Sequence, residues 1–536
     1  MSSFAVSVVS AEQRYTGRGG LARGAITAPR GGTARFQVVV ERTAGSEPIT
    51  LDIRFGPSDG VVIRPRRVGH VPLPHYNTAT EQNDRHDYGA APTLAPDPLF
   101  DDTRIALGPA ERVVYWVLIK IDADAGSGTR TIEFELVGDE SGSEETISVG
   151  SVDLRIAHVR LEPRDGLDVI HWFYPDTILD YYGFETFDNS YWNMIPSYMQ
   201  NLIDHGINVL FVPIFTPATD GERRPSQLLD IGRTGDGYRY DFSDVKRYLD
   251  LGRKAGYSKF EWTHLFSQWG ARSGISVYEG QGANEVRLFP GNSDSTGDTY
   301  RSFLESFLPK FKSFIDHEGL IESSYFHISD EPHSDEDLQR YRAARELVRR
   351  IAPWMKTNDA VSDITYGKQG ITDIPVPTIR MVNEYIEAGI DCFTYYCCGP
   401  RGRYVNRLID TPLVKIQALG WLLYRFQAKI HGFLHWGYNY WYKHQTRELI
   451  DPFTVTDGSA WPGWAYGDTF VVYPGPNGPI DSLRWEAFSA GLEDYRLLQS
   501  GRVDPDSALL APLRGFDDFP IDLGYYSTAR GSILGR

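Results

Sequence analysis

An apolar segment that runs directly into two neighbouring carboxylates is the first candidate for catalytic chemistry in this 536-residue sequence. The segment is Tyr325–Pro332 (YFHISDEP), and its pattern predicts a buried strand that ends at Asp330 and Glu331. If a bend turns both side chains into one pocket, one carboxyl group can protonate a leaving oxygen while the other stays ionised and orients a reacting group. A second interpretation stays open, in which Asp330 caps the following helix and Glu331 is solvated in its first turn.

Two later segments place aromatic and polar side chains at predicted strand ends. In Phe393–Pro400 (FTYYCCGP), Tyr395 or Tyr396 can donate a phenolic hydrogen bond, although each also has an explanation as a buried aromatic. The segment Gly432–Trp441 (GFLHWGYNYW) is expected to line a sugar-binding site. Its candidate walls are Trp436 and Trp441, and its candidate partners for sugar hydroxyls are Tyr438 and Asn439.

Several other residues are candidates for substrate binding, and each of them also has a purely structural explanation. They are His171, Trp172, His264, Trp269, His327 and Arg484. For Arg484, and for Glu493 and Asp494 on the same predicted helix, a structural ion-pair network explains the residues equally well. The adjacent Cys397 and Cys398 lie in an apolar aromatic run, which favours inert thiols over a reactive Cys–His pair.

Short apolar runs alternate with amphipathic helical patterns from about Gly166 onward, and this alternation predicts eight strand–helix units. The predicted strands are Asp168–Phe173, Asn208–Phe215, Ser258–His264, Tyr325–Ser329, Lys356–Asp359, Ile371–Ile374, Ile390–Tyr396 and His431–Tyr438, of which the fifth and sixth have the weakest patterns. The predicted helices are Ser190–His205, Phe242–Ala255, Thr299–His317, Ser334–Ile351, Ile379–Ala388, Pro412–Ala428 and Ile480–Gln499. This order favours a (β/α)₈ TIM-type barrel, whose chemistry lies at the carboxyl ends of its strands. An open doubly wound sheet is the alternative, but no glycine-rich phosphate motif follows the first strand.

The first 160 or so residues have a different pattern, with β-branched or alternating runs separated by Gly, Pro, Ser and Asp clusters. This pattern is typical of a β-sandwich. A segment rich in Pro, His, Asn and Asp, Leu73–Leu99, is expected to be a long loop. The sequence therefore predicts an N-terminal β-sandwich over residues 1–163, a (β/α)₈ catalytic barrel over 164–500, and a C-terminal extension packed on the barrel over 501–536.

Charge and composition exclude several classes of function. Lys and Arg total 54 against 71 Asp and Glu, a net charge of −17, and no long basic run occurs, so nucleic acid and anionic membranes are not expected partners. The 12 Trp, 31 Tyr and 27 Phe fit a site that stacks on sugar rings. No zinc, calcium or serine-hydrolase motif is present, so neither a metal nor a cofactor is expected. The chain begins without a secretion signal and has no long apolar run, which predicts a cytoplasmic protein; its oligomeric state stays open.

Four motifs in a fixed order resemble a known group of bacterial proteins. They are the segment ending in Asp330-Glu331-Pro332, the run Tyr395–Pro400, the run Gly432–Asn439, and Tyr473–Ile480 followed by Gly491–Tyr495. Together they are similar to proteins that carry the domain of unknown function 4091, which are related to glycoside hydrolase family 123. The resemblance covers about Gly166 to Gln499.

The resemblance implies an exo-acting β-N-acetylgalactosaminidase that uses substrate-assisted, retaining catalysis on an oligosaccharide or a glycolipid glycan. In that scheme Glu331 is the general acid and then the base, Asp330 orients the 2-acetamido group, and Tyr395 donates a hydrogen bond to the acetamido carbonyl. The carbonyl oxygen attacks the anomeric carbon to form an oxazoline, so no enzyme nucleophile is needed. Two alternatives remain: a glycosidase for a sugar without acetamido assistance, and a non-catalytic carbohydrate-binding protein.

Overall fold

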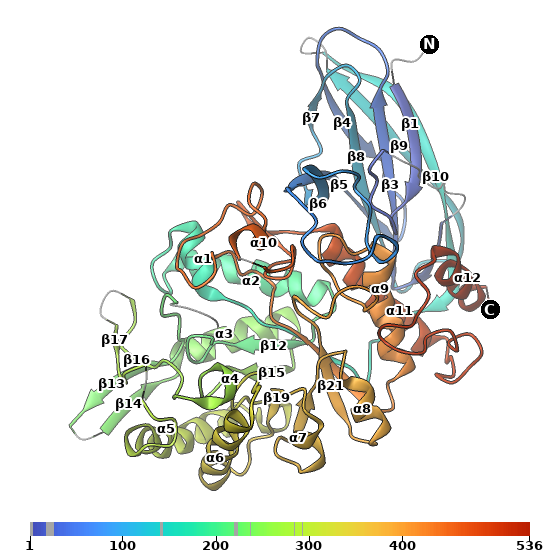
Figure 1. The fold of residues 1–536 in the computed structure, drawn as a ribbon. Helices are drawn as coiled ribbons and strands as arrows, with labels where there is room; N and C mark the ends of the chain where they lie inside the picture. Colours follow the sequence, from blue (N-terminus) through green and yellow to red (C-terminus); the bar gives the residue numbers. More distant parts are fainter. Residues whose placement is uncertain are drawn as a thin grey trace. The chain divides into compact units, whose positions relative to one another are not determined.

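The computed structural model describes residues 4–17, 26–139, 143–218, 223–235, 237–282, 285–291, 293–461 and 463–535. The chain divides into two compact units (Figure 1). Unit 1 comprises residues 1–165, 405–425 and 480–536, and unit 2 comprises residues 166–404 and 426–479. The predicted domain boundaries at residues 163 and 500 stay predictions.

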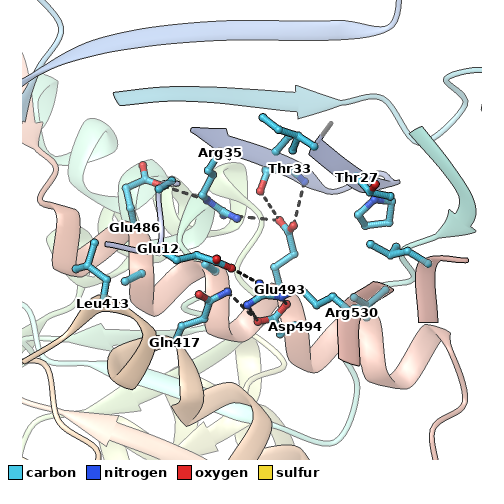
Figure 2. Close-up of a pocket in the computed structure, with 18 of the residues that line it drawn as sticks. Glu12, Thr27, Thr33, Arg35, Leu413, Gln417, Glu486, Glu493, Asp494 and Arg530 are labelled. Carbon is cyan, nitrogen blue, oxygen red and sulfur yellow. Dashed lines mark hydrogen bonds and ion pairs between the residues drawn. The ribbon is translucent and has the colours of Figure 1, made fainter. Parts of the chain in front are cut away.

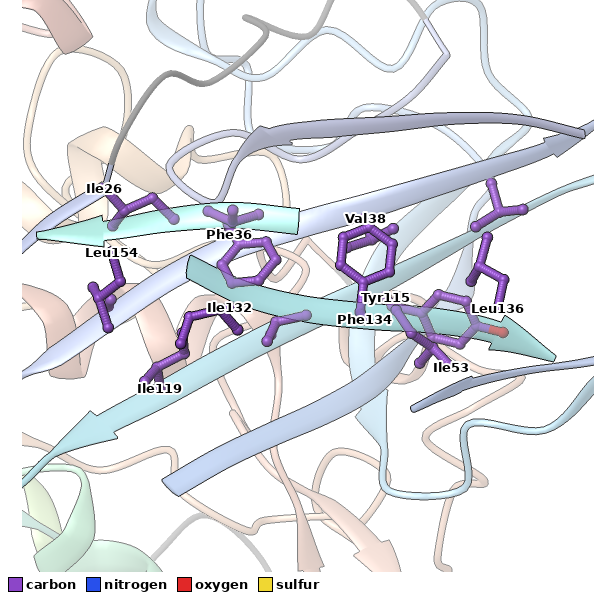
Figure 3. Packing of buried hydrophobic residues seen from close by; sticks show 14 of the residues in the cluster. Ile26, Phe36, Val38, Ile53, Tyr115, Ile119, Ile132, Phe134, Leu136 and Leu154 are labelled. Atoms are coloured by element: carbon purple, nitrogen blue, oxygen red, sulfur yellow. The ribbon is translucent and has the colours of Figure 1, made fainter. Parts of the chain in front are cut away.

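The N-terminal part of unit 1 consists of two five-stranded sheets. One has the order β1 (Phe4–Ser10), β3 (Thr33–Arg42), β8 (Arg112–Ile121), β5 (Val61–Leu73) and β6 (Thr93–Phe100); the other has the order β2 (Ile26–Arg30), β10 (Glu144–Arg160), β9 (Gly128–Asp139), β4 (Ile49–Phe55) and β7 (Ile105–Leu107). Alternate side chains of the two sheets, among them Phe36, Tyr115 and Phe134, meet in one hydrophobic core (Figure 3). The predicted N-terminal β-rich region is confirmed.

The expected long loop over Leu73–Leu99 is wrong from Thr93 onward. Strand β6 begins at Thr93 and pairs with β5, although it contains Pro96 and Pro98. Proline cannot donate a ladder hydrogen bond, but β6 is an edge strand, where that loss is tolerated. A 3₁₀ turn, Gln82–Asp84, lies within the part of the segment that is a loop.

Three helices complete unit 1: α9 (Leu413–Arg425), α11 (Leu483–Ser500) and α12 (Leu523–Leu534). The first two have almost entirely buried faces and pack at very short range. A Cβ added at Gly420 would lie 1.7 Å from the carbonyl oxygen of Gly491, so only glycine permits this approach of the two backbones.

Unit 2 is built around a six-stranded sheet in which every pairing is parallel. Its order is β18 (Ser324–Tyr325), β15 (Lys259–Trp262), β12 (Val209–Val212), β11 (Asp168–His171), β22 (Ile430–His435) and β21 (Cys392–Tyr395); β19 (Asn358–Ala360) and β20 (Ile374–Val376) form a further parallel pair. Each of the eight predicted strands overlaps one of these eight. These eight strands are short and mostly buried, as expected for strands covered on both faces.

Helices follow the strands of unit 2, and most of them lie where the sequence predicts them. They are α1 (Pro175–Tyr182), α2 (Asn189–Asp204), α3 (Ser243–Ala255), α4 (Gln268–Ala271), α5 (Asp298–His317), α6 (Asp335–Ile351), α7 (Ile364–Lys368), α8 (Val382–Glu387) and α10 (Asp457–Ala460), with a 3₁₀ turn at Ile321–Ser323. Three short hairpins lie in the loops between these elements. They are β13 (Asp230–Thr234)–β14 (Gly237–Asp241), β16 (Tyr278–Glu279)–β17 (Val286–Arg287) and β23 (Tyr473–Gly475)–β24 (Gly478–Ile480). None of the described helices combines the length and the apolar character that crossing a bilayer requires.

Candidate active site

A cavity of about 340 Å³ in unit 2 contains the Asp330–Glu331 pair at the carboxyl ends of the parallel strands. Six residues that the sequence singled out line it: Trp172, Trp269, Asp330, Glu331, Tyr395 and Trp436. Gln268, a weaker candidate beside Trp269, and Cys397, expected to be inert, also line it, and the sequence interpretation missed Tyr174, His333, Trp461 and Trp464. The cavity thus combines two carboxyl groups with an aromatic wall, the composition of a site that binds a sugar.

A sharp bend at Glu331 brings the two adjacent carboxyl groups to one cavity. Glu331 has a φ of 38°, in the left-handed region that side chains other than glycine rarely adopt, and its N–H donates to the carbonyl oxygen of Ala360 at 3.0 Å. Such a conformation costs about 1–2 kcal/mol and persists where surrounding contacts impose it. The bend that the acid–base interpretation requires is therefore present.

The alternative in which Asp330 caps the following helix is wrong. Helix α6 has Ser334 as its N-cap, with a reciprocal capping box to Asp337, and the Ser334 side chain accepts from the Asp337 N–H at 3.1 Å. Asp330 is only 7% exposed and accepts a hydrogen bond from the Gln268 side chain at 3.2 Å. The helix start is already satisfied without it.

Burial and the neighbouring Glu331 favour the protonated form of Asp330. Burial, and next the neighbouring Glu331, raise the pKa of Asp330 well above its usual value. The adjacent Glu331 carboxyl group adds to the cost of ionising Asp330, so without substrate Asp330 keeps its proton at pH values where an exposed Asp has lost it.

The phenol of Tyr395 contacts this pair directly. Its O–H donates to Oε1 of Glu331, and burial followed by Glu331 raises the pKa of Tyr395 well above its usual value, so the phenol stays a donor. Its predicted contact with an acetamido carbonyl stays a prediction, and it requires the hydroxyl to change partner when substrate enters.

Behind the cavity wall lies a buried charged cluster that contains His327. Nε2 of His327 is 2.8 Å from Glu261, and Nδ1 is 3.5 Å from Asp359. Burial alone would lower the pKa of His327, but the two carboxylates raise it to about 10. Glu261 also accepts a hydrogen bond from the indole of Trp172 at 3.0 Å, so the cluster anchors a cavity residue. His327 itself does not line the cavity.

We expect His327→Gln to destabilise the protein, and most strongly at low pH. Folding raises the pKa of His327, so the charged imidazole adds to the free energy of unfolding. This contribution has its full value below about pH 6.5 and is lost as the pH rises toward 10. Removing one partner of a buried ion pair costs about 3–5 kcal/mol. Urea unfolding between pH 6 and 10 should show a gap between wild type and variant that narrows with rising pH.

A matched control for this measurement is His158→Gln, which removes an exposed histidine of unit 1. Its urea midpoints should follow those of the wild type across the same pH range. A gap between wild type and His327→Gln that stays constant with pH would contradict a charged imidazole at this position.

Three other predicted contacts lie beneath the cavity, in the aromatic packing of unit 2. His171 stacks on His435 with ring centroids 5.5 Å apart, and His264 stacks on His327 at 4.4 Å. Tyr396 packs against the rings of Phe433 and His435. All three predicted contacts are buried, and none lines the cavity.

The segment after β22 contributes one cavity wall and several anchors. The indole N–H groups of Trp436 and Trp464 both donate to Asp468, at 3.0 and 2.8 Å, and these bonds fix the orientation of the two rings in the cavity wall. Asn439 clamps the backbone of Tyr174, accepting from its N–H at 3.0 Å and donating to its carbonyl at 3.1 Å.

Two further predicted contacts of this segment point elsewhere. The Tyr438 hydroxyl donates to Asn201 at 2.9 Å, and the Trp441 indole donates to the carbonyl of Val472 at 3.1 Å. Neither residue lines the cavity. Trp461 and Trp464 are two further residues that line the cavity. Their spacing of three residues in the segment after β22 was the sequence signal that could have identified them.

Arg484 belongs to unit 1 and is not among the residues that line the cavity. It is fully buried and forms an ion pair with Asp97 at 2.9 Å. Two other acidic residues of α11 also form ion pairs: Glu493 lies 3.8 Å from Arg35, and Asp494 is paired with Arg530 at 2.7 Å (Figure 2). These contacts are the ion-pair network that the sequence left as one of two explanations.

Comparison with known proteins matches most of unit 2 to a family of catalytic domains. A family model described as "Glycoside hydrolase 123, catalytic domain" matches residues 172–500. The comparison with curated protein sequences gave no match. Among solved structures, a family 123 glycoside hydrolase from Clostridium perfringens, studied for glycolipid glycan hydrolysis, is similar with a TM-score of 0.71 at 15% identity, covering 99% of this chain and 97% of that one.

Two other solved glycosidases have much lower scores. A GH10 xylanase from termite gut has a TM-score of 0.31 at 10% identity, over 71% of this chain and 90% of that one. A GH2 beta-galacturonidase from Eisenbergiella tayi also scores 0.31, at 11% identity, over 86% and 69%. The family model spans more than half of the sequence, and the strand-end carboxylates lie within the matched range. The chain therefore belongs to glycoside hydrolase family 123.

Proposed function

We propose that this protein is an exo-acting glycoside hydrolase that removes terminal β-N-acetylgalactosamine by substrate-assisted, retaining catalysis. The observation that carries the proposal is the bend at Glu331, which presents two sequence-adjacent carboxyl groups to one cavity. Among the described residues that line this cavity, Asp330 and Glu331 are the only carboxylates. Ordinary glycosidases place two carboxyl groups on opposite sides of the scissile bond, whereas substrate assistance needs no enzyme nucleophile.

The proposed reaction assigns one task to each carboxyl group. The N–H of the bound acetamido group stabilises ionised Asp330, so its proton passes to Glu331, which donates it to the glycosidic oxygen while the bond between that oxygen and the anomeric carbon breaks. The acetamido carbonyl oxygen, oriented by the carboxylate of Asp330 through the acetamido N–H, forms a bond to the anomeric carbon and gives an oxazolinium ion that keeps the N–H proton. Glu331 then takes a proton from water, which attacks the anomeric carbon and opens the oxazolinium ring with net retention.

The same proposal includes a closed (β/α)₈ barrel as the scaffold. It is supported by the pairing of β11 with both β12 and β22. Two isolated parallel bridges, Phe326 with Thr357 and Thr378 with Tyr395, connect the β19–β20 pair to β18 on one side and to β21 on the other. Eight strands linked in this ring would place all the cavity residues at one end of a barrel.

The substrate we propose is the terminal sugar of an oligosaccharide or a glycolipid glycan. The Clostridium perfringens relative is described as acting on glycolipid glycans, which supports the second source. Trp172 and Trp436 provide apolar faces for the sugar ring, and the Asp330–Glu331 pair provides the polar contacts.

Hydrolysis of the nitrophenyl β-glycosides of GalNAc, GlcNAc and Gal tests the proposal. Release from the GalNAc glycoside, with the β-anomer as the first product seen by NMR, is the expected result. Turnover of the galactoside, which lacks the acetamido group, would overturn substrate assistance but not the glycosidase assignment. No turnover of any of the three, combined with measurable sugar binding, would favour a carbohydrate-binding protein.

A further inference from the structure

The turn that carries Trp269 has a backbone conformation that is rare outside glycine. Trp269 has φ 56° and ψ 60°, Gly270 has φ 83° and ψ 33°, and Ala271 has φ 55°. Two of these three left-handed residues have side chains, and that arrangement is strained. Strain of this kind persists where the surrounding structure imposes it, commonly at ligand sites.

Hydrogen bonds fasten this turn to the strand end that carries the carboxyl pair. The N–H of Trp269 donates to the carbonyl oxygen of Asp330 at 2.7 Å. The N–H of Ala271 donates to Oγ of Ser329 at 2.9 Å, and that hydroxyl donates to the carbonyl of Ser267 at 2.7 Å. The side chain of Gln268 reaches the Asp330 carboxyl group at 3.2 Å. These hydrogen bonds fix the position of the turn relative to Asp330.

The other face of the turn is closed against helix α6. A Cβ added at Gly270 would lie 2.4 Å from Cβ and 2.8 Å from Cα of Asp337, so there is no space for the turn to shift in that direction. Its position is therefore determined on both sides.

The result of this arrangement is an exposed indole beside the carboxyl pair. Trp269 lines the cavity but is 40% exposed, whereas Trp172 and Trp461 in the same cavity are 4% and 2% exposed. Trp269 therefore lies at the rim of the cavity, and the other two form its inner wall. An exposed tryptophan on a strained, tightly held turn indicates that something outside the protein covers it.

The size of the cavity shows where a substrate must extend. About 340 Å³ is near the lower end of the range for small-molecule sites, which suits one sugar unit. In an exo-acting enzyme the terminal sugar occupies the cavity, so the leaving group passes over the rim. Gln268, next to Trp269, also lines a second cavity of about 530 Å³, so open space continues beyond the turn.

We infer that Trp269 is the platform of a leaving-group subsite, where its indole stacks on the apolar face of the sugar ring next to the scissile bond. The strained turn aligns this platform with Asp330, so the enzyme selects substrates in which a sugar, and not a small alkyl group, is released. The inference rests on the proposed glycosidase function, but not on the identity of the terminal sugar.

The test compares two GalNAc glycosides that differ only in the leaving group. One is a disaccharide of β-GalNAc linked to galactose, and the other is the 2,2,2-trifluoroethyl β-glycoside, which has no ring to stack. Trp269→Ala should lower kcat/KM about tenfold on the disaccharide, equivalent to about 1.4 kcal/mol, and less than twofold on the trifluoroethyl glycoside. Trp269→Phe, which keeps an aromatic face, should restore most of the loss.

Val286→Ala is the control, because Val286 is 61% exposed in the same unit and does not line the cavity. Equal losses of Trp269→Ala on both glycosides would overturn the inference, because they would mean that Trp269 only supports Asp330. No loss on either glycoside would also overturn it.

A binding measurement keeps the inference testable if the proposed function fails. If the wild type cleaves no GalNAc glycoside, the proposed function is wrong, and calorimetry with the Glu331→Gln variant then compares the disaccharide with methyl β-GalNAc. Tighter binding of the disaccharide, lost when Trp269→Ala is added, supports the subsite. Equal binding of the two ligands, or no binding of either, overturns it.

Discussion

Glu331→Gln is expected to lower kcat for β-glycoside hydrolysis by about 10²–10⁴-fold, the usual loss when a general acid is removed. The side chain keeps its shape, and its amide oxygen can still accept the hydrogen bond that Tyr395 donates to Glu331. Substrate binding should therefore stay close to that of the wild type. Steady-state kinetics together with calorimetric binding separate the two effects.

The leaving group provides a second readout of the same change. A nitrophenolate departs without full protonation, whereas an alkoxide does not, so the loss should be larger for alkyl glycosides than for nitrophenyl glycosides. Glu336→Gln is the matched control: it makes the same change five residues further on, at a side chain that is 79% exposed. If kcat of Glu331→Gln equals that of the wild type, the pair is not catalytic and the carbohydrate-binding alternative gains support.

Asp330→Asn is expected to abolish most turnover of acetamido sugars, with a loss of about 10²–10³-fold, because a misoriented acetamido group attacks poorly. The loss should be specific. On any substrate that reacts without the acetamido group, the variant should retain most of the rate of the wild type. The same factor lost on both kinds of substrate would contradict the role in orienting the acetamido group.

The same substitution should raise stability, which distinguishes it from damage to the fold. Folding raises the pKa of Asp330, through burial and then through Glu331, so the folded state binds more protons than the unfolded state. Stability therefore falls as pH rises through the range between the ordinary pKa of Asp, about 3.9, and the raised value. A neutral Asn removes this penalty, so the thermal midpoint of the variant should exceed that of the wild type by an amount that grows from pH 4 toward neutrality. A thermal midpoint of Asp330→Asn below that of the wild type at neutral pH would count against a buried Asp330 that is repelled by Glu331.

Local patterns in the sequence were sufficient for the parallel strands and the long helices of unit 2, but not for its short helices and hairpins. Most of these strands are short apolar runs that break at a polar or glycine-containing segment, although β19 (Asn358–Ala360) is not, and each long helix has an apolar face repeated at helical spacing. For this reason the predicted helix Ser190–His205 differs from α2, Asn189–Asp204, by one residue at each end. The rule that chemistry follows the strand ends likewise selected Asp330 and Glu331 and left Tyr395 and Tyr396 as alternatives, between which the family resemblance chose Tyr395.

The tertiary structure decided which of the strand-end residues face the cavity. His171, His264 and Asn439 lie at or just beyond predicted strand ends, as several cavity residues do, yet the first two are buried in ring stacks and the third holds the backbone of Tyr174. Residue type and spacing determine which face of an element is buried, but not which loops converge above it. The walls formed by Trp461 and Trp464 come from such a loop.

The sequence by itself determined that two adjacent carboxylates end a buried strand between two helices. It could not determine that both would face one cavity, because adjacent side chains of a regular strand point to opposite faces. The positive φ of Glu331 overcomes that alternation, and its N–H is held by the carbonyl of Ala360 from the neighbouring strand. The partner that imposes the bend is distant in the sequence, so only the folded chain brings the acid and its neighbour together.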